Sequence, residues 1–152
     1  MKPLPRLIHA IARLRWRVFR PIAVGVRVLL VQDDKVLLVK HTYQKSWYLP
    51  GGGVERDETV EAALRREVRE ETDAQLGSLV LLGVYSSFYE YKSDHIIVFV
   101  CKDFSLRGKT DREIAAWSFF PIGGLPADIS PGTRRRIEEY LLEDDSPTVG
   151  RW

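Results

Sequence analysis

The sequence predicts an α/β protein in which a mixed β-sheet lies between helices, an α/β/α sandwich. Several short segments after residue 21 have alternating or continuous apolar residues, a pattern typical of strands. Two other segments, residues 58–74 and the stretch after Ser130, have the spacing of amphipathic helices. A chain of 152 residues with 45% hydrophobic side chains suffices for one domain with a sizeable core.

The first 20 residues are expected to form a basic amphipathic helix. They hold six Lys and Arg residues and no acid, which leaves 17 basic and 21 acidic side chains in the other 132 residues. Apolar residues recur in this segment at spacings of three and four, at Leu4, Leu7, Ile8, Ile11, Leu14 and Val18. The favoured interpretation is a helix packed on its own domain or on a partner subunit, which leaves a homodimer open. A membrane-surface helix and, in a eukaryote, a transit peptide are the alternatives.

The next segment is expected to be a β-hairpin. Apolar residues alternate over residues 22–30, Asp33-Asp34 supplies a turn, and residues 36–39 are again apolar. Residues 47–50 are expected to form a further short strand that leads into the glycines at residues 51–53.

Basic and aromatic side chains fill the approach to these glycines. Lys40, His41 and Tyr43 could hold a nucleotide by charge and stacking. The alternative is that they are ordinary exposed residues of a connecting loop.

An acidic helix follows the glycine-rich loop. We expect it to cover residues 58–74 and to begin at Asp57 or Glu58, with an apolar face made by Val60, Ala63 and Leu64. Continued into the last turns, the same face carries Glu67, Glu70 and Glu71. Clustered carboxylates suit a hard divalent cation, Mg²⁺ or Mn²⁺, because such ions prefer oxygen ligands. The alternative is a solvated charged helix face.

The spacing of this stretch resembles the Nudix box. The matching residues are Gly52, then Glu58 after five residues, and, after seven more, the run Arg66-Glu67-Val68-Arg69-Glu70-Glu71-Thr72. The resemblance implies a Nudix-like α/β/α sandwich with a mixed sheet, and a hydrolase that cuts the pyrophosphate linkage of a nucleoside diphosphate derivative with Mg²⁺ or Mn²⁺. Asp73 stands where the family has a glycine, and Asp tolerates the left-handed conformation that often ends a helix.

The resemblance also implies roles for single residues. The metal ligands would be Glu67, Glu70, Glu71 and the carbonyl of Gly51. The general base would be Glu70 or Glu113, since family members differ in the position that they use. Glu58 and Arg66 resemble the internal ion pair that fixes the loop against the helix.

The segment after the box contains two apolar runs, residues 78–84 and 95–100, which are expected to be strands covered on both faces. The loop between them is rich in aromatic residues, and Tyr89 and Tyr91 are candidates for choosing the substrate. Tyrosines there resemble those of Nudix members that act on dinucleoside polyphosphates, and the proline frequent in ADP-ribose hydrolases is absent. A nucleoside triphosphate or a dinucleoside polyphosphate is therefore favoured over ADP-ribose; exposed tyrosines without a role are the alternative.

The last part of the domain, which we place at residues 21–143, is expected to end in a helix. Ser130-Pro131 has the chemistry of a helix start, and Arg134, Arg135 and Arg136 are expected to be mostly solvated. Residues 144–152 are expected to be a loosely ordered tail.

These patterns favour a cytoplasmic enzyme that acts on a nucleotide, with no stable nucleic-acid complex. The single cysteine, Cys101, excludes an intramolecular disulfide. A nucleotide-sensing domain without catalysis is the alternative function, and three mutually repelling glutamates disfavour it.

Overall fold

The computed structural model describes residues 22–89, 91–108, 113–142 and 146–152, so the predicted basic helix of residues 1–20 lies outside the described residues. None of the helices in this part of the chain is long and apolar enough to cross a membrane. The elements in chain order are β1 (Ile22–Gln32), β2 (Lys35–His41), α2 (Val60–Thr72), β3 (Ala74–Leu76), β4 (Val80–Ser87), β5 (Ser93–Cys101), β6 (Phe104–Leu106), β7 (Ile114–Pro121), a 3-10 turn (Ile122–Gly124), α3 (Pro131–Tyr140) and β8 (Thr148–Arg151).

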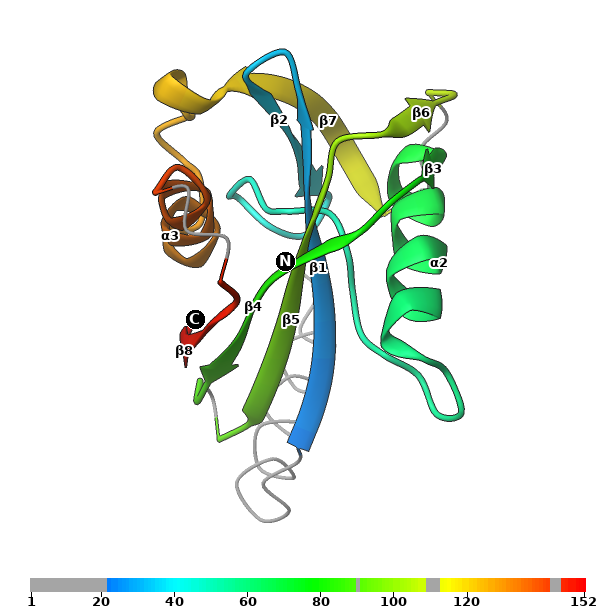
Figure 1. The fold of residues 1–152 in the computed structure, drawn as a ribbon, viewed down its shortest axis with the longest axis vertical. Helices are drawn as coiled ribbons and strands as arrows, with labels where there is room; N and C mark the ends of the chain where they lie inside the picture. Colours follow the sequence, from blue (N-terminus) through cyan, green and yellow to red (C-terminus); the bar gives the residue numbers. More distant parts are fainter. Residues whose placement is uncertain (1–21, 90, 109–112, 143–145) are drawn as a thin grey trace, which may run out of the picture.

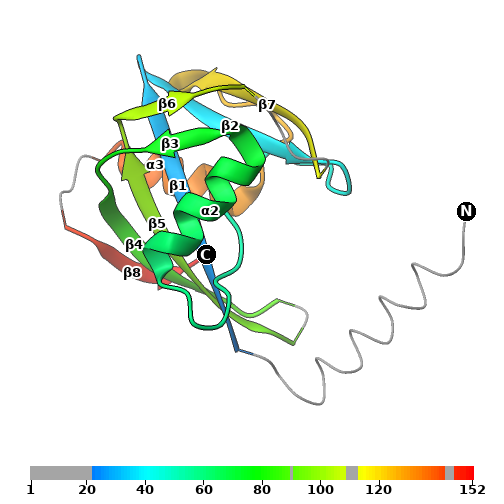
Figure 2. The same ribbon diagram turned by 90° about the vertical axis from the view of Figure 1, so that its right-hand side faces the viewer.

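The strands form a six-stranded mixed sheet with helices on both sides, as the sequence predicted. The strand order is β7-β2-β1-β5-β4-β8, with β1–β5 and β4–β8 parallel and the other pairs antiparallel. Helix α2 covers one face and α3 the other, while β3 and β6 form a separate two-stranded sheet beside the end of α2 (Figures 1 and 2). Each helix packs over its own cluster of buried apolar side chains.

The predicted hairpin is present, and its two strands soon separate. Asp33 and Asp34 form the turn with positive φ angles of 49° and 57°, the conformation of a two-residue hairpin loop. β1 and β2 pair only next to this turn, at Val31↔Val36 and Gln32↔Lys35. The sheet is therefore split along most of β1.

The glycine-rich loop fills this split. The carbonyls of Gly52 and Pro50 accept hydrogen bonds from the backbone N–H groups of Val26 and Val28, at 2.9 and 3.0 Å. The strand expected at residues 47–50 is reduced to isolated bridges, Val39↔Tyr48 and Trp47↔Ile129, because the segment contacts a different neighbour on each side. The loop is thus fixed by backbone hydrogen bonds to β1.

Strand β4 is less covered than its apolar sequence suggested. Val80 and Leu81 are exposed, at 64% and 37%. Strand β8 pairs only with Gly83 to Ser86, so the start of β4 lies at the edge of the sheet. The expectation that both faces of this strand are covered is therefore wrong for its first residues, while Cys101 at the end of β5 is buried as expected.

The end of the chain corrects two expectations. Residues Thr148–Arg151 form β8, and the backbone N–H of Trp152 donates to the carbonyl of Ser86 at 3.0 Å, so this part of the expected tail is ordered. The Trp152 ring packs edge-on against Tyr85, with 6.2 Å between the ring centroids, and this buried contact holds the segment in place. Arg136 lies under the same cluster with only 6% of its surface exposed, contrary to the expected solvated position.

Candidate active site

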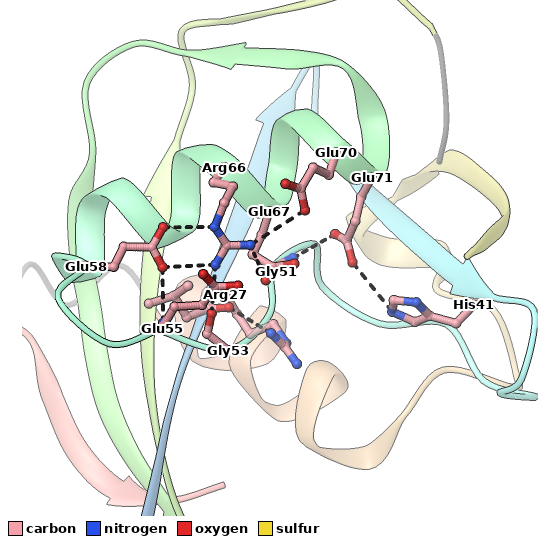
Figure 3. Close-up of polar contacts among 11 residues, drawn as sticks. Arg27, His41, Gly51, Gly53, Glu55, Glu58, Arg66, Glu67, Glu70 and Glu71 are labelled. Carbon is pink, nitrogen blue, oxygen red and sulfur yellow. Dashed lines mark hydrogen bonds and ion pairs between the residues drawn. The ribbon is translucent and has the colours of Figure 1, made fainter. Parts of the chain in front are cut away.

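A pocket of about 380 Å³ opens between the last turns of α2, the glycine-rich loop, the end of β2 and the start of β7. Figure 3 shows how the polar side chains from these elements converge on the loop. The residues that line the pocket are Arg27, His41, Tyr43, Gln44, Tyr48, Gly51, Gly52, Gly53, Glu67, Glu70, Glu71, Glu113 and Ile114. Elements far apart in the sequence therefore meet around one cavity.

The first two glycines of the loop are required by close approach. Gly51 has a φ of 129°, and a Cβ atom there would lie 2.2 Å from the carbonyl oxygen of Val26. A Cβ atom on Gly52 would lie 2.2 Å from the carboxyl carbon of Glu67. A larger residue at Gly51 would force the loop away from β1, and a larger residue at Gly52 would displace the carboxylate of Glu67.

Helix α2 delivers its carboxylates from a well-defined start and end. Thr59, not Asp57 or Glu58, is the N-cap, because its hydroxyl accepts a hydrogen bond from the N–H of Ala62 at 3.1 Å. Asp73 ends the helix in the left-handed conformation with a φ of 52°, and its N–H donates to the carbonyl of Arg69 at 2.9 Å. Asp73 thus adopts the geometry that the family's glycine position suggested.

Glu71 is the buried carboxylate of the site, with 6% of its surface exposed. Its Oε2 atom accepts a hydrogen bond from the N–H of Gly51 at 2.8 Å, and its Oε1 atom lies 3.6 Å from Nε2 of His41. The pKa of Glu71 is raised to about 7: burial is the main cause and the charges of Glu67 and Glu70 add to it, while the Gly51 hydrogen bond and the charge of Arg27 oppose the shift. Glu71 therefore lies in surroundings that lack a strong positive partner.

Arg66 organises the remaining acidic residues of the box. Its guanidinium forms a two-bond ion pair with Glu58, at 2.8 and 2.9 Å, and a third contact of 2.8 Å with Oε1 of Glu67. The carbonyl of Gly53 accepts a further hydrogen bond from it at 3.1 Å, and Oε2 of Glu70 lies 3.6 Å away. The hydrogen bond to Arg66 holds the pKa of Glu58 below its usual value. The expected Glu58–Arg66 pair thus connects the loop to the helix.

The donor set of the pocket fits a hard divalent cation in its chemistry. Three glutamates and backbone carbonyls supply oxygen ligands only, and Glu71 has a raised pKa that a cation would reverse. Within the described residues, however, no three His, Cys, Asp or Glu side chains already surround a common metal position. Glu67 and Glu70 point toward Arg66 instead, so they would have to rotate to share an ion with Glu71.

The opposite wall combines aromatic rings with one carboxylate. The ring centroid of His41 lies 5.3 Å from that of Tyr43 and 6.2 Å from that of Tyr48. Burial and the nearby Arg27 lower the pKa of His41, and its buried Nδ1 atom has no hydrogen-bond partner among the residues that the structure describes. Glu113 lies on this wall at the start of β7, where its carbonyl accepts a hydrogen bond from the N–H of Thr42 at 2.9 Å. His41, Tyr43 and Glu113 thus occupy the pocket where the sequence suggested.

Three predicted substrate-binding residues do not line the pocket. Lys40 pairs with Asp128 at 2.8 Å and lies over the ring of Trp47, because neighbouring strand residues point to opposite faces and His41 takes the pocket side. Tyr89 and Tyr91 are exposed beside the β4–β5 connection, at 72% and 49%. Their predicted contact with substrate therefore has no support from the pocket geometry.

Sequence reasoning missed Arg27. This arginine is the charged residue within the apolar run of β1, between the buried residues Val26 and Val28, and it lines the pocket. A charge in the interior of an otherwise apolar strand was the signal that could have identified it.

Known proteins resemble this chain over most of its length. An ADP-ribose pyrophosphatase of Methanocaldococcus jannaschii is 35% identical over 132 residues, which cover 84% of this chain and 78% of that protein. A MutT-like protein of Streptomyces ambofaciens is 34% identical and covers 76% of this chain and 69% of its own length. The crystal structure of a MutT NUDIX hydrolase from Burkholderia pseudomallei matches with a TM-score of 0.70 and 29% identity, over 78% of this chain and 97% of that one. The sequence model of the NUDIX domain matches residues 20–140, and the chain therefore belongs to the NUDIX family.

Proposed function

We propose that this protein is a metal-dependent hydrolase that cleaves the pyrophosphate linkage of a nucleotide in the pocket between α2 and β7. Membership of the NUDIX family supports pyrophosphate cleavage as the reaction class. The observation that carries the proposal is the position of Glu71, a buried carboxylate held by the N–H of Gly51 beside two further glutamates of α2. A domain that only binds nucleotides has no need of this unfavourable group.

The proposed ligands of Mg²⁺, or of Mn²⁺ in its place, are Glu67, Glu70, Glu71 and the carbonyl of Gly51. A bound divalent ion would neutralise the diphosphate and lower the pKa of a coordinated water. The N–H of Gly51 fixes the orientation of Glu71, and Arg66 holds Glu67 and Glu58 so that the loop stays against the helix. Glu71 is therefore already oriented, whereas Glu67 and Glu70 would have to turn from Arg66 toward the ion.

Two carboxylates are candidates for the general base, and they lie on different walls. Glu70 is half-exposed at the end of α2, whereas Glu113 lies at the start of β7 on the wall with His41 and Tyr43. A base takes the proton of the attacking water, so its replacement by glutamine should lower kcat and remove the acidic limb of the pH–rate profile. Glu70→Gln and Glu113→Gln, compared in this way, assign the role.

The substrate class that we favour is a nucleoside triphosphate. The names of related proteins point in different directions: ADP-ribose pyrophosphatase in M. jannaschii, RNA pyrophosphohydrolase in Xanthomonas oryzae and putative 8-oxo-dGTP diphosphatase in Bacillus subtilis. Since Tyr89 and Tyr91 do not line the pocket, the sequence cue for dinucleoside polyphosphates is weakened. A pocket of about 380 Å³ suits one nucleotide better than two.

A Mg²⁺-dependent screen tests the proposal. Nucleoside triphosphates, ADP-ribose, nucleotide sugars and dinucleoside polyphosphates are offered to the native protein, Glu67→Gln and Glu71→Gln, and released phosphates are quantified. Glu61→Gln is the matched control, because Glu61 lies on the exposed face of the same helix and pairs with Arg65. Turnover that only the pocket variants abolish supports the proposal. Nucleotide binding without any turnover would instead favour a sensing domain.

A further inference from the structure

Arg27 places a positive charge in the pocket whose role the proposed metal site does not explain. It comes from the middle of β1, beside the glycine-rich loop, and its guanidinium lines the cavity together with Glu67 and Glu71 (Figure 3). Its strand neighbours Val26 and Val28 are completely buried, so the position of the side chain is fixed by the core.

The guanidinium of Arg27 has few partners in the protein. Among the described residues its one hydrogen bond is from Nη1 to the carbonyl oxygen of Val26, at 2.8 Å. A guanidinium carries five N–H donors, so most donors of Arg27 have no acceptor among the described residues, and the residue lines the pocket. It makes no ion pair with Glu67 or Glu71, although it is near enough to both for their charges to act on it.

Two other arginines show how this protein satisfies a guanidinium that has only a structural role. Arg66 contacts Glu58, Glu67 and the carbonyl of Gly53. Arg136 contacts Glu139 and the carbonyl of Arg151, and it lies 3.7 Å from the ring centre of Tyr85. Arg27 is held in place by its strand, but among the described residues it has no carboxylate or aromatic partner of this kind. Its free N–H donors could therefore be satisfied by an anion from outside the protein.

We propose that Arg27 binds phosphate oxygens of the substrate, so that the diphosphate is held between this guanidinium and the carboxylate side of the pocket. This inference rests on the proposed function, because it concerns the same pocket. The planar fork of an arginine matches two oxygens of one phosphate, which a lysine at this position could not do. Cations bound by the glutamates and the charge of Arg27 would then face the diphosphate from different sides.

A structural alternative gives Arg27 a different task, that of a counter-ion that merely stabilises the buried Glu71. The two roles differ in what they predict for an anion alone. A phosphate-binding arginine determines the affinity for inorganic pyrophosphate, whereas a counter-ion determines the stability of the protein and the titration of Glu71.

The test is calorimetric binding of inorganic pyrophosphate, with Mg²⁺ present, to the native protein, Arg27→Met, Arg27→Lys and Arg56→Met. Arg56 is exposed in the loop before α2 and lies outside the pocket lining, so its variant is the matched control. We expect Arg27→Met to weaken pyrophosphate binding and to raise the KM for the cleaved nucleotide about 10- to 100-fold, since hydrogen bonds to charged groups are lost. Arg27→Lys should recover part of the affinity, and Arg56→Met should bind as the native protein does.

The outcomes separate this inference from the proposed function. A folded Arg27→Met or Arg27→Lys protein with native pyrophosphate affinity would overturn the inference, and so would a native protein that binds no pyrophosphate. If pyrophosphate binding is lost in Arg27→Met while the native protein cleaves no nucleotide, the inference on Arg27 stands and the proposed hydrolase fails. Near-UV circular dichroism of each variant confirms that the fold is intact before binding is compared.

Discussion

The two helices that flank the sheet each bury one charged residue, and the two charges have opposite surroundings. Glu71 on α2 and Arg136 on α3 are both only 6% exposed. Arg136 has a carboxylate at 2.8 Å from Glu139, a backbone carbonyl at 3.0 Å and the ring of Tyr85 over its plane. Glu71 has one backbone N–H, a histidine whose pKa is lowered, and the charge of Arg27, which acts on it without an ion pair among the described residues.

This difference indicates that Arg136 stabilises the fold, whereas Glu71 is positioned to bind a ligand. The charge of Arg136 is paired with that of Glu139, and the hydroxyl of Tyr85 also donates to this carboxylate at 2.7 Å, although among the described residues the Nε atom of Arg136 has no hydrogen-bond partner. The surroundings of Glu71 are incomplete, and a cation would complete them. Removing the charge of Glu71 should therefore affect activity, whereas removing the charge of Arg136 should affect stability.

The largest effect should come from Glu71→Gln, on activity. The amide oxygen of glutamine can still accept the hydrogen bond from Gly51, so we expect the fold to persist while a negative ligand is lost. Turnover should fall at least about 1,000-fold, because metal-based stabilisation of the transition state is worth several kcal/mol. Steady-state kinetics with Mg²⁺ measure the loss, and a Glu71→Gln enzyme with more than a tenth of native kcat would contradict the proposed role.

The next largest effect should come from Arg136→Met, on stability. This change keeps much of the side-chain volume over Tyr85 but leaves Glu139 without its buried partner. We expect the free energy of unfolding to fall by about 3 kcal/mol, with KM unchanged for the protein that remains folded. Urea denaturation gives the first quantity; a native denaturation midpoint would show that the cluster is not stabilising.

The pH dependence of stability should distinguish the two charges further. The pKa of Glu71 is raised from 4.5 to about 7, so the folded protein holds this proton more tightly than the unfolded chain does. Without metal, the free energy of unfolding should therefore decrease as pH rises from about 4.5 to about 7, by about 3 kcal/mol relative to Glu71→Gln. Added Mg²⁺ should reverse part of the loss at pH 8. Parallel stability profiles for the native protein and Glu71→Gln would contradict the assigned pKa.

The features that could be predicted from the sequence are those whose geometry depends on residues close to them in the chain. Helix α2, the hairpin turn at Asp33-Asp34 and the start of α3 at Ser130 follow from local periodicity and capping. The Glu58–Arg66 pair was implied by the resemblance to the Nudix box, and it joins one loop to the helix that follows it. Their geometry needs little information from the rest of the chain.

The positions that the sequence misjudged depend on contacts between distant segments. Arg27 enters the pocket because β1 and β2 separate after two residue pairs and the glycine loop fills the gap. Arg136 is buried because Trp152, at the end of the chain, packs on Tyr85 and Gly132. For Arg27 the local signal was only its charge within an apolar strand, which does not reveal the pocket, and Arg136 stands in a run of arginines that is typical of an exposed helix face.

The smallest effect concerns how the two helices end. Helix α3 ends at Leu141 in a right-handed conformation, whereas α2 ends at Asp73 with a positive φ. Glycine adopts this conformation without a steric cost, and its introduction also removes a negative charge from the helix C-terminus. Asp73→Gly should therefore raise the free energy of unfolding by about 0.5–1 kcal/mol.

Asp73→Asn separates the two causes, because asparagine tolerates the left-handed conformation but carries no charge. Thermal denaturation of the three proteins at one pH is the measurement. If Asn gives the same gain as Gly, the charge at the end of α2 was the unfavourable feature; a gain with Gly alone assigns it to the backbone. A loss of stability in both variants would mean that the Asp73 side chain stabilises the exit of α2, and the family's glycine position would then be filled here by a different and favourable arrangement.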